Sequence, residues 1–183
     1  MDQEQELHLV ARVREGNTEA YQSLLRHHLP SLNRYVTRMI GNTEDAEEIL
    51  QDIFLRLWQK ANQFNPRKSK LTTWLHQIAH NCCIDAFRKK KPLIVDLNEG
   101  EDFELVGQNS PQEDFIQGQK NQFLAAAIQQ LPENQKSALL LSYYQGLTNK
   151  QTAQILSISV EALESLLVRT RKKLQQTLDG VML

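Results

Sequence analysis

The feature that most constrains the fold of this chain is an abrupt change of pattern near residue 92. Residues 92–119 carry seven acids and no Lys or Arg, and Gly, Asn, Ser and Pro are scattered through them without a hydrophobic period. That composition is typical of a flexible connection. On either side of it, apolar residues recur with helical spacing. We therefore predict an all-α chain with two small helical domains, residues 1–91 and 119–183, joined by a flexible acidic linker at residues 92–118.

The same boundary organises the charge of the chain. The formal net charge is −1, but residues 1–91 carry +3, residues 92–119 carry −7 and residues 120–183 carry +3. Because charges act over only about 8 Å in physiological salt, the local sums matter more than the total. Two basic domains can each bind nucleic acid. We expect the acidic linker to compete weakly with DNA in the free protein.

Several classes of protein are excluded by the composition. No apolar run approaches the roughly 20 residues that a membrane helix needs, and the polar start from Met1 to Glu4 is unlike a signal peptide. The two cysteines, Cys82 and Cys83, are adjacent, which suits neither a structural disulfide nor a metal site. We therefore expect a cytoplasmic protein with reduced cysteines and no insertion into a membrane. The low content of Gly (7) and Pro (5) favours helices throughout.

Start and stop signals divide the first domain into five helices. Gly16 and Gly41 are typical of helix C-termini, Pro30 is expected to end a helix, and Asn42 with Thr43 is expected to cap the next one. The helices are predicted at about residues 3–15, 18–29, 32–40, 43–61 and 71–90.

The predicted helix at 43–61 has two distinct faces. One is a broad apolar stripe from Ile49 to Ala61. The other gathers acidic and amide side chains around one leucine, namely Glu48, Gln51, Asp52 and Leu55. Such a face is either solvated surface or a docking site for a partner protein, and the spacing allows both.

A basic segment follows this helix. From Pro66 to Lys91 there are seven basic residues and one acid, and the polar side of helix 71–90 carries amides. Such a cluster suits contacts with phosphates. Cations at the end of a helix also favour its dipole, so the pattern by itself allows both explanations.

The most specific local pattern lies in the second domain. Thr148 and Gln151 fit a capping box at the start of a short helix. The residues Ser157-Ile158-Ser159 make a tight connection, and Ser159 is expected to cap a longer last helix that ends in basic residues. We expect Ile158 to fill the angle between the two helices. This order predicts a helix-turn-helix.

No enzymatic chemistry is predicted. His76 and His80 are spaced i, i+4, and His27 and His28 are adjacent, but neither pair has a third ligand at useful spacing. The sequence also lacks a glycine-rich phosphate loop and a nucleophile elbow. We therefore expect no catalytic residue, no metal site, no cofactor and no small-molecule substrate.

Three segments of the chain resemble the sigma factors of RNA polymerase. Residues 45–58 are similar to the helix that docks on the polymerase, residues 64–91 to the helix that reads the promoter, and residues 131–174 to the C-terminal sigma domain. Two helical domains and a linker of this length resemble the small extracytoplasmic-function (ECF) type. The resemblance implies a subunit that binds core RNA polymerase and directs promoter-specific initiation of transcription.

This resemblance implies a role for each domain. The first domain would dock on the coiled coil of the polymerase clamp through Asp45, Glu48, Gln51, Asp52 and Leu55. It would also read the −10 element of the promoter through Lys68, Ser69, Lys70, Asn81, Asp85, Arg88 and Lys89. The second domain would read the −35 element in the major groove through Thr148, Lys150, Ser159, Glu161, Glu164, Ser165, Val168, Arg169, Arg171 and Lys172.

Some positions depart from the commonest family pattern. Many members carry basic residues where Glu164 and Leu166 stand here, and we expect Leu166 to pack inward. Trp74 is expected in the core, because it shares the buried stripe of Ile78. Family members are commonly held inactive by an anti-sigma factor, so such a protein is a candidate partner. The alternative is a stand-alone helix-turn-helix transcriptional regulator, which accounts for residues 119–183 but not for the acidic face or the basic segment.

Overall fold

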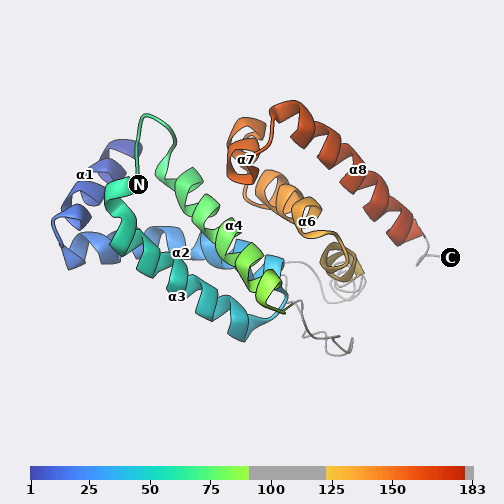
Figure 1. The fold of residues 1–183 in the computed structure, drawn as a ribbon, viewed down its shortest axis with the longest axis horizontal. Coiled ribbons are helices and arrows are strands. Elements are labelled where there is room, and N and C mark those ends of the chain that lie inside the picture. Colours follow the sequence, from blue (N-terminus) through green and yellow to red (C-terminus); the bar gives the residue numbers. More distant parts are fainter. Residues whose placement is uncertain (91–122, 180–183) are drawn as a thin grey trace, which may run out of the picture.

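The computed structural model describes residues 1–90 and 123–179, and all of its regular structure is helical (Figure 1). The linker predicted at 92–118 and both domain boundaries lie outside the described residues. In addition to a helical segment at 123–129, the elements are α1 (Gln3–Arg14), α2 (Thr18–Ile40), α3 (Thr43–Lys60), the 3₁₀ turn η1 (Ala61–Gln63), α4 (Leu71–Lys90), α6 (Glu133–Leu139), the π-helical turn η2 (Leu140–Tyr144), α7 (Asn149–Leu156) and α8 (Val160–Asp179). The all-α prediction is confirmed.

The predicted break at Pro30 is wrong, because α2 runs through it as one continuous helix. Proline lacks the N–H that would bond to the carbonyl of Arg26, at a typical cost of about 3 kcal/mol. Pro30 is exposed, whereas Leu24 and Leu32 on either side of it are fully buried. Continuing the helix places both halves of one apolar stripe in the core, and this burial offsets the local cost.

Other helix ends follow their predicted signals. Gly41 ends α2 in the left-handed region at φ 77°. Asn42 caps α3 by accepting a hydrogen bond from the backbone N–H of Asp45 at 3.1 Å. The capping box of Thr148 and Gln151 is formed at the start of α7.

The helix-turn-helix of α7 and α8 is formed as predicted, but its turn is built differently. Ser159 caps α8 by accepting from the backbone N–H of Ala162 at 3.1 Å. Ile158 is 37% exposed, so it does not fill the angle between the helices. The apolar side chains between these helices come instead from α6, α7 and α8. They form a small cluster of Ala138, Ala153, Leu163 and Leu167, with Leu156, Val160 and Leu166 packed against it. The inward packing of Leu166 is confirmed.

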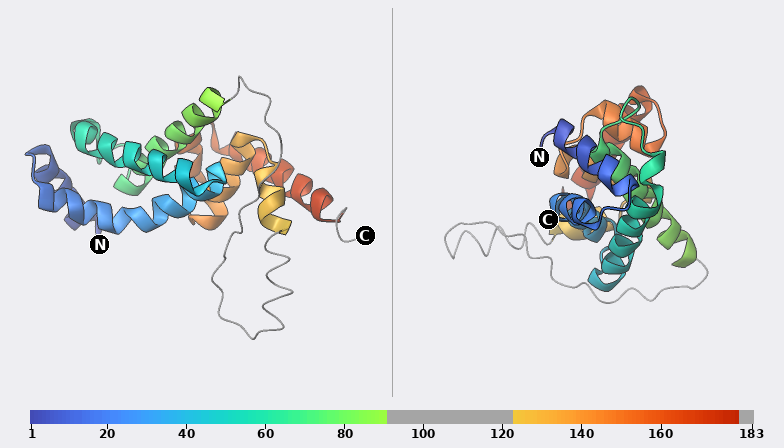
Figure 2. Two further views of the ribbon diagram at one scale, coloured as in Figure 1. Left: turned by 90° about the horizontal axis from the view of Figure 1, so that it is seen from below. Right: turned by 90° about the vertical axis from the view of Figure 1, so that its left-hand side faces the viewer.

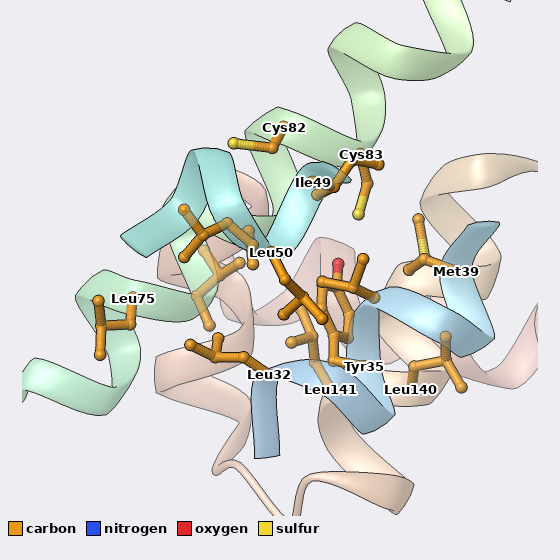
Figure 3. Close-up of a cluster of buried hydrophobic side chains, with 14 of the residues drawn as sticks. Leu32, Tyr35, Met39, Ile49, Leu50, Leu75, Cys82, Cys83, Leu140 and Leu141 are labelled. Carbon is orange, nitrogen blue, oxygen red and sulfur yellow. The ribbon is translucent and has the colours of Figure 1, made fainter. Parts of the chain in front are cut away.

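The two helical units pack directly against each other. Figures 1 and 2 show α4 beside α7, with α6 and α7 between α4 and α8. In Figure 3, Leu140 and Leu141 of η2 lie with Leu32, Tyr35 and Met39 of α2 in one apolar cluster. The sequence predicted two separate domains, yet the two units share one core in this structure. Within the described ranges, no helix is long and apolar enough to cross a membrane.

Candidate functional site

The outer face of α3 presents the residues predicted to bind polymerase. Ala46, Ile49, Leu50, Ile53, Phe54 and Leu57 point into the core. Glu48, Gln51 and Asp52 are exposed on the other side, and Leu55 is 51% exposed among them. Asp45, at the start of the helix, is half-buried. Together these five residues form what we call the acidic α3 face, on which one large apolar side chain is surrounded by polar ones.

A groove of about 430 Å³ separates the acidic α3 face from α4. Its α3 wall includes Asp45, Glu48, Asp52 and Arg56, and its α4 wall includes Asp85, Arg88 and Lys89. Two sets of residues that the sequence assigns to different tasks therefore line one hollow. The exposed pair of Arg88 Nη1 and Asp85 Oδ1 is 3.9 Å apart, a distance that contributes little to stability in water. These side chains are available to a partner.

The loop between η1 and α4, which we call the lysine loop, holds two exposed lysines, Lys68 and Lys70. Asn65 organises it, because its side-chain oxygen accepts from the N–H of Arg67 at 2.9 Å and its carbonyl accepts from the N–H of Lys68 at 3.0 Å. Neither lysine has an ion-pair partner among the described residues. Their ammonium groups are therefore placed for phosphate contacts. Ser69 between them is half-buried.

A residue that the sequence reasoning missed fixes the start of this loop. Arg14, at the end of α1, donates from Nε to the carbonyl of Ala61 at 3.1 Å and from Nη2 to the carbonyl of Phe64 at 2.7 Å. Charge-assisted hydrogen bonds of this kind are among the stronger ones in proteins. No local pattern marks Arg14, because its acceptors lie about fifty residues away along the chain.

Helix α4 carries its predicted polar side chains on an exposed face. Asn81, Asp85, Arg88 and Lys89 are all exposed. Trp74 is half-buried and packs against Phe64, with ring centroids 5.5 Å apart, so it lies at the edge of the core and not inside it as predicted.

Both cysteines lie on the buried side of α4. Cys82 and Cys83 are free thiols (Figure 3). Burial is the main reason why the pKa of each thiol is raised. They are therefore protonated thiols that pack as small apolar side chains.

The ten residues predicted to read the −35 element are all exposed on α7, α8 and their caps. Two of them are occupied by local structure, since Thr148 and Ser159 accept the capping hydrogen bonds of α7 and α8. Glu161 lies in the first turn of α8, where hydrogen bonds from its own backbone and from Ser159 lower its pKa. The remaining positions on α8, from Glu164 to Lys172, present exposed side chains along the helix.

A second groove, of about 290 Å³, lies between η2 and α8. Arg171 stacks over the ring of Tyr143, 5.2 Å from its centroid, and donates a hydrogen bond to its hydroxyl. On the same surface Asn149 Nδ2 donates to Glu164 Oε1 at 3.2 Å, and Val168 is 64% exposed. Sequence reasoning missed the roles of Tyr143 and Asn149, because their partners Arg171 and Glu164 lie on another helix, 28 and 15 residues further along the chain.

The loop that carries Lys68 and Lys70 contacts the helix-turn-helix through α7 and the start of α4. Gln151 Nε2 of α7 donates to Thr73 Oγ1 of α4 at 3.2 Å, and Gln154 Nε2 donates to the carbonyl of Lys68 at 3.4 Å. Helix α7 therefore lies against the base of the lysine loop.

Deeper in the same interface is a buried polar cluster. The hydroxyl of Tyr35 lies 2.8 Å from Ser137 Oγ and 3.3 Å from His80 Nδ1, and Ser137 Oγ lies 3.0 Å from the same nitrogen. Burial lowers the pKa of His80 to about 4, so the ring is neutral. Lys136 is also buried and donates to Gln129 Oε1 at 2.8 Å and to the carbonyl of Met39 at 3.3 Å.

Comparison with known families assigns both helical units. The model of Sigma-70 region 2 matches residues 24–92, and the model of Sigma-70 region 4 matches residues 124–174. The first match contains the acidic α3 face and the lysine loop, and the second contains the helix-turn-helix.

Individual relatives match over most of their length. The chain is 26% identical to the ECF RNA polymerase sigma factor SigW of Bacillus subtilis over 177 residues, which covers 92% of this chain and 94% of SigW. It is 30% identical to SigM of the same organism over 145 residues, with 78% of this chain and 85% of SigM covered.

Two solved structures share the fold. CnrH, in complex with the cytosolic domain of CnrY, superimposes with a TM-score of 0.70 at 21% identity, covering 96% of this chain and 98% of CnrH. The sigma factor RpoE in complex with the anti-sigma factor NepR from Bartonella quintana gives 0.69 at 20% identity, covering 87% of this chain and 96% of RpoE.

Proposed function

The chain belongs to the ECF sigma factors of RNA polymerase, and on this premise we propose how its residues divide the work of initiation. The family directs promoter-specific initiation of transcription and is not enzymatic. The main support for this function is that Sigma-70 regions 2 and 4 occur together in this chain and in this order. A stand-alone regulator leaves region 2 without a role. The proposed division is residues 1–91 for docking and the −10 element, residues 92–118 as linker, and residues 119–183 for the −35 element.

The acidic α3 face is the proposed contact with core RNA polymerase. Leu55 is a large apolar side chain that is exposed to solvent, and Glu48 and Asp52 lie on the same face of α3. An apolar anchor inside a polar rim is the usual anatomy of a protein interface. The acids complement an arginine-rich partner surface and favour fast association with it.

A charge reversal on this face tests the contact. Asp52→Arg should abolish co-elution with core polymerase in gel filtration and should leave the circular dichroism spectrum unchanged, because Asp52 is exposed. Glu4→Arg is the matched control, because it reverses an exposed acid on α1, away from this face. Normal co-elution of Asp52→Arg would remove the assignment of the face while leaving the family membership intact.

The lysine loop and α4 are proposed to read the −10 element. Lys68, Lys70, Arg88 and Lys89 would bind backbone phosphates, since each is exposed and cationic. Asn81 and Asp85 offer donors and acceptors to base edges. A single strand with an extruded base costs a few kcal/mol of unstacking, which these contacts must offset.

Helix α8 is proposed to enter the major groove at the −35 element. Glu164 would accept from the amino group of a cytosine, and Arg169 and Arg171 would contact bases or phosphates. Arg169→Ala in the full chain should weaken binding to −35 duplex DNA by about 1–3 kcal/mol, or roughly 5- to 150-fold. Arg26→Ala, an exposed arginine of α2, is the control. Equal affinity of the Arg169 and Arg26 variants would contradict the placement of α8.

We further propose a cytoplasmic location and regulation by an anti-sigma factor. A sigma factor has to be in the same compartment as the DNA template and the polymerase. CnrH and RpoE, which share the fold, were solved in complex with CnrY and with the anti-sigma factor NepR. The groove between α3 and α4 is a surface that such a protein and the polymerase would compete for, since the acidic α3 face forms one of its walls.

A further inference from the structure

Three potential metal ligands from two helices meet where α1 packs against α2. Glu6 of α1 and the adjacent His27 and His28 of α2 bring their ligand atoms within 4.8 Å of one another. Glu6 Oε1 is 3.2 Å from His28 Nε2 and 4.0 Å from His27 Nε2. The sequence suggested that His27 and His28 were isolated, and this expectation is wrong. Glu6 is twenty-one residues away in the chain, and only the packing of α1 on α2 reveals it.

We propose that Glu6, His27 and His28 bind a divalent transition-metal ion, for which Zn²⁺ is the best fit. Two imidazole nitrogens and one carboxylate oxygen form an established donor set for Zn²⁺. With metal–ligand bonds of about 2.0–2.2 Å, tetrahedral ligands lie roughly 3.3–3.5 Å apart. The Glu6–His28 pair already has nearly this spacing.

The longer distance, 4.0 Å between Glu6 Oε1 and His27 Nε2, can be shortened by movement of the His27 side chain alone. His27 is exposed at the surface of α2, whereas Glu6 and His28 are 8% and 4% exposed. Rotation of the His27 ring therefore needs no rearrangement of the core. Its ring meets that of His28 edge-on, with centroids 4.9 Å apart, so both rings already face one region. Water would supply the fourth ligand from the side of His27.

An independent observation also points to a ligand at this position. His28 Nε2 is fully buried and has no hydrogen-bond partner within the described part of the chain, although it faces Glu6 Oε1. A buried polar atom without a hydrogen bond is costly and rare in folded proteins. Glu6 is likewise a buried carboxylate whose ion-pair partners, among the described residues, are only these two histidines. A bound cation would satisfy both groups at once.

Metal at this site would tie α1 to α2. Helix α1 also anchors the η1 turn through Arg14, which donates to two of its carbonyls. The metal would thus hold the helix that positions the start of the lysine loop.

The test uses the full chain after removal of metal with a chelator. Calorimetric titration with Zn²⁺ should show one ion per chain. At a free concentration 100-fold above Kd, Zn²⁺ should raise Tm by about 5 °C or more. Co²⁺ in its place should give the intense visible absorption of a four-coordinate site.

Variants distinguish this site from adventitious binding. Glu6→Gln keeps the shape of the side chain, and His27→Gln changes only an exposed one, so both should fold and both should lose the Tm shift. His8→Gln alters an exposed histidine of α1 and should keep it. Absence of stoichiometric binding to the parent chain, or an undiminished Tm shift in His27→Gln and Glu6→Gln, would overturn the proposal. Loss of binding only on substitution of Cys82 or Cys83 would overturn it as well.

Discussion

The buried His80 predicts a specific loss of stability in mild acid. Its ring lies between Tyr35 of α2 and Ser137 of α6, with hydroxyl oxygens 3.3 Å and 3.0 Å from Nδ1. Burial is the cause that lowers its pKa to about 4. The unfolded chain has no such burial, so its His80 should titrate near the ordinary value of about 6.5.

The direction of this pH effect follows from the number of protons bound in the folded and unfolded states. Between these two pKa values the unfolded chain binds more protons than the folded chain, so the free energy of unfolding falls as the pH falls. A single group contributes a slope of about 1.4 kcal/mol per pH unit inside this window. Between pH 7 and pH 5, His80 should therefore cost the fold roughly 2 kcal/mol. Burial also lowers the pKa of His76, which adds to the loss in the same direction.

Urea unfolding at a series of pH values measures this slope. His80→Asn places an amide oxygen near the position of Nδ1 and removes the titration. The variant should be less stable than the parent at pH 7, because it leaves a gap in the core. Its stability should nevertheless fall less steeply between pH 7 and pH 5. His8→Asn, at an exposed histidine, should keep the parent slope. If His80→Asn and the parent lose the same free energy over this range, then burial of His80 does not control the acid response.

Three further substitutions test local parts of the fold by urea unfolding. Gly41→Ala should destabilise the chain by about 1 kcal/mol or more, because φ is 77° and the new Cβ would lie 3.0 Å from Gln129 Oε1; an unchanged midpoint would contradict this. Arg14→Met should cost about 1–3 kcal/mol through the loss of two hydrogen bonds to the turn at 61–64, and faster amide exchange in that turn should accompany it. Thr148→Ala should cost about 1 kcal/mol by removing the cap of α7, whereas Thr148→Ser should cost little.

Sequence patterns were reliable where the physical cause is local. The capping box of Thr148 and Gln151 needs only four consecutive residues, and it is formed. The exposure of Leu55 follows from the spacing of the apolar residues in α3 alone. The inward packing of Leu166 follows in the same way from its place between Leu163 and Leu167. These patterns were sufficient to place the candidate residues of α3 and α8 on exposed faces, except Asp45, which is half-buried.

The sequence failed where a distant partner decides the outcome. Pro30 carries a strong local signal for a break, but the buried stripe of α2 outweighs it. Ile158 was expected inside the turn, where Leu163 and Leu167 already fill the space. The neighbours of His28 could not be foreseen either, since Glu6 reaches it only after α1 has packed on α2. Each of these outcomes depends on tertiary contacts that no local spacing encodes.

The interface between the two helical units is the largest feature that the sequence concealed, and its composition limits its strength. Leu140 and Leu141 bury apolar surface against α2, which favours docking. His80 and Lys136 are buried in the same interface, and burial lowers the pKa of both, so desolvation of the Lys136 ammonium group and of the polar His80 ring opposes docking. The hydrogen bonds of Lys136 to Gln129 and Met39 recover part of this cost, but only when the units meet in one register. The polar groups therefore favour one relative position of the two units but weaken their association. The net free energy of docking is smaller than the shared apolar core alone would suggest.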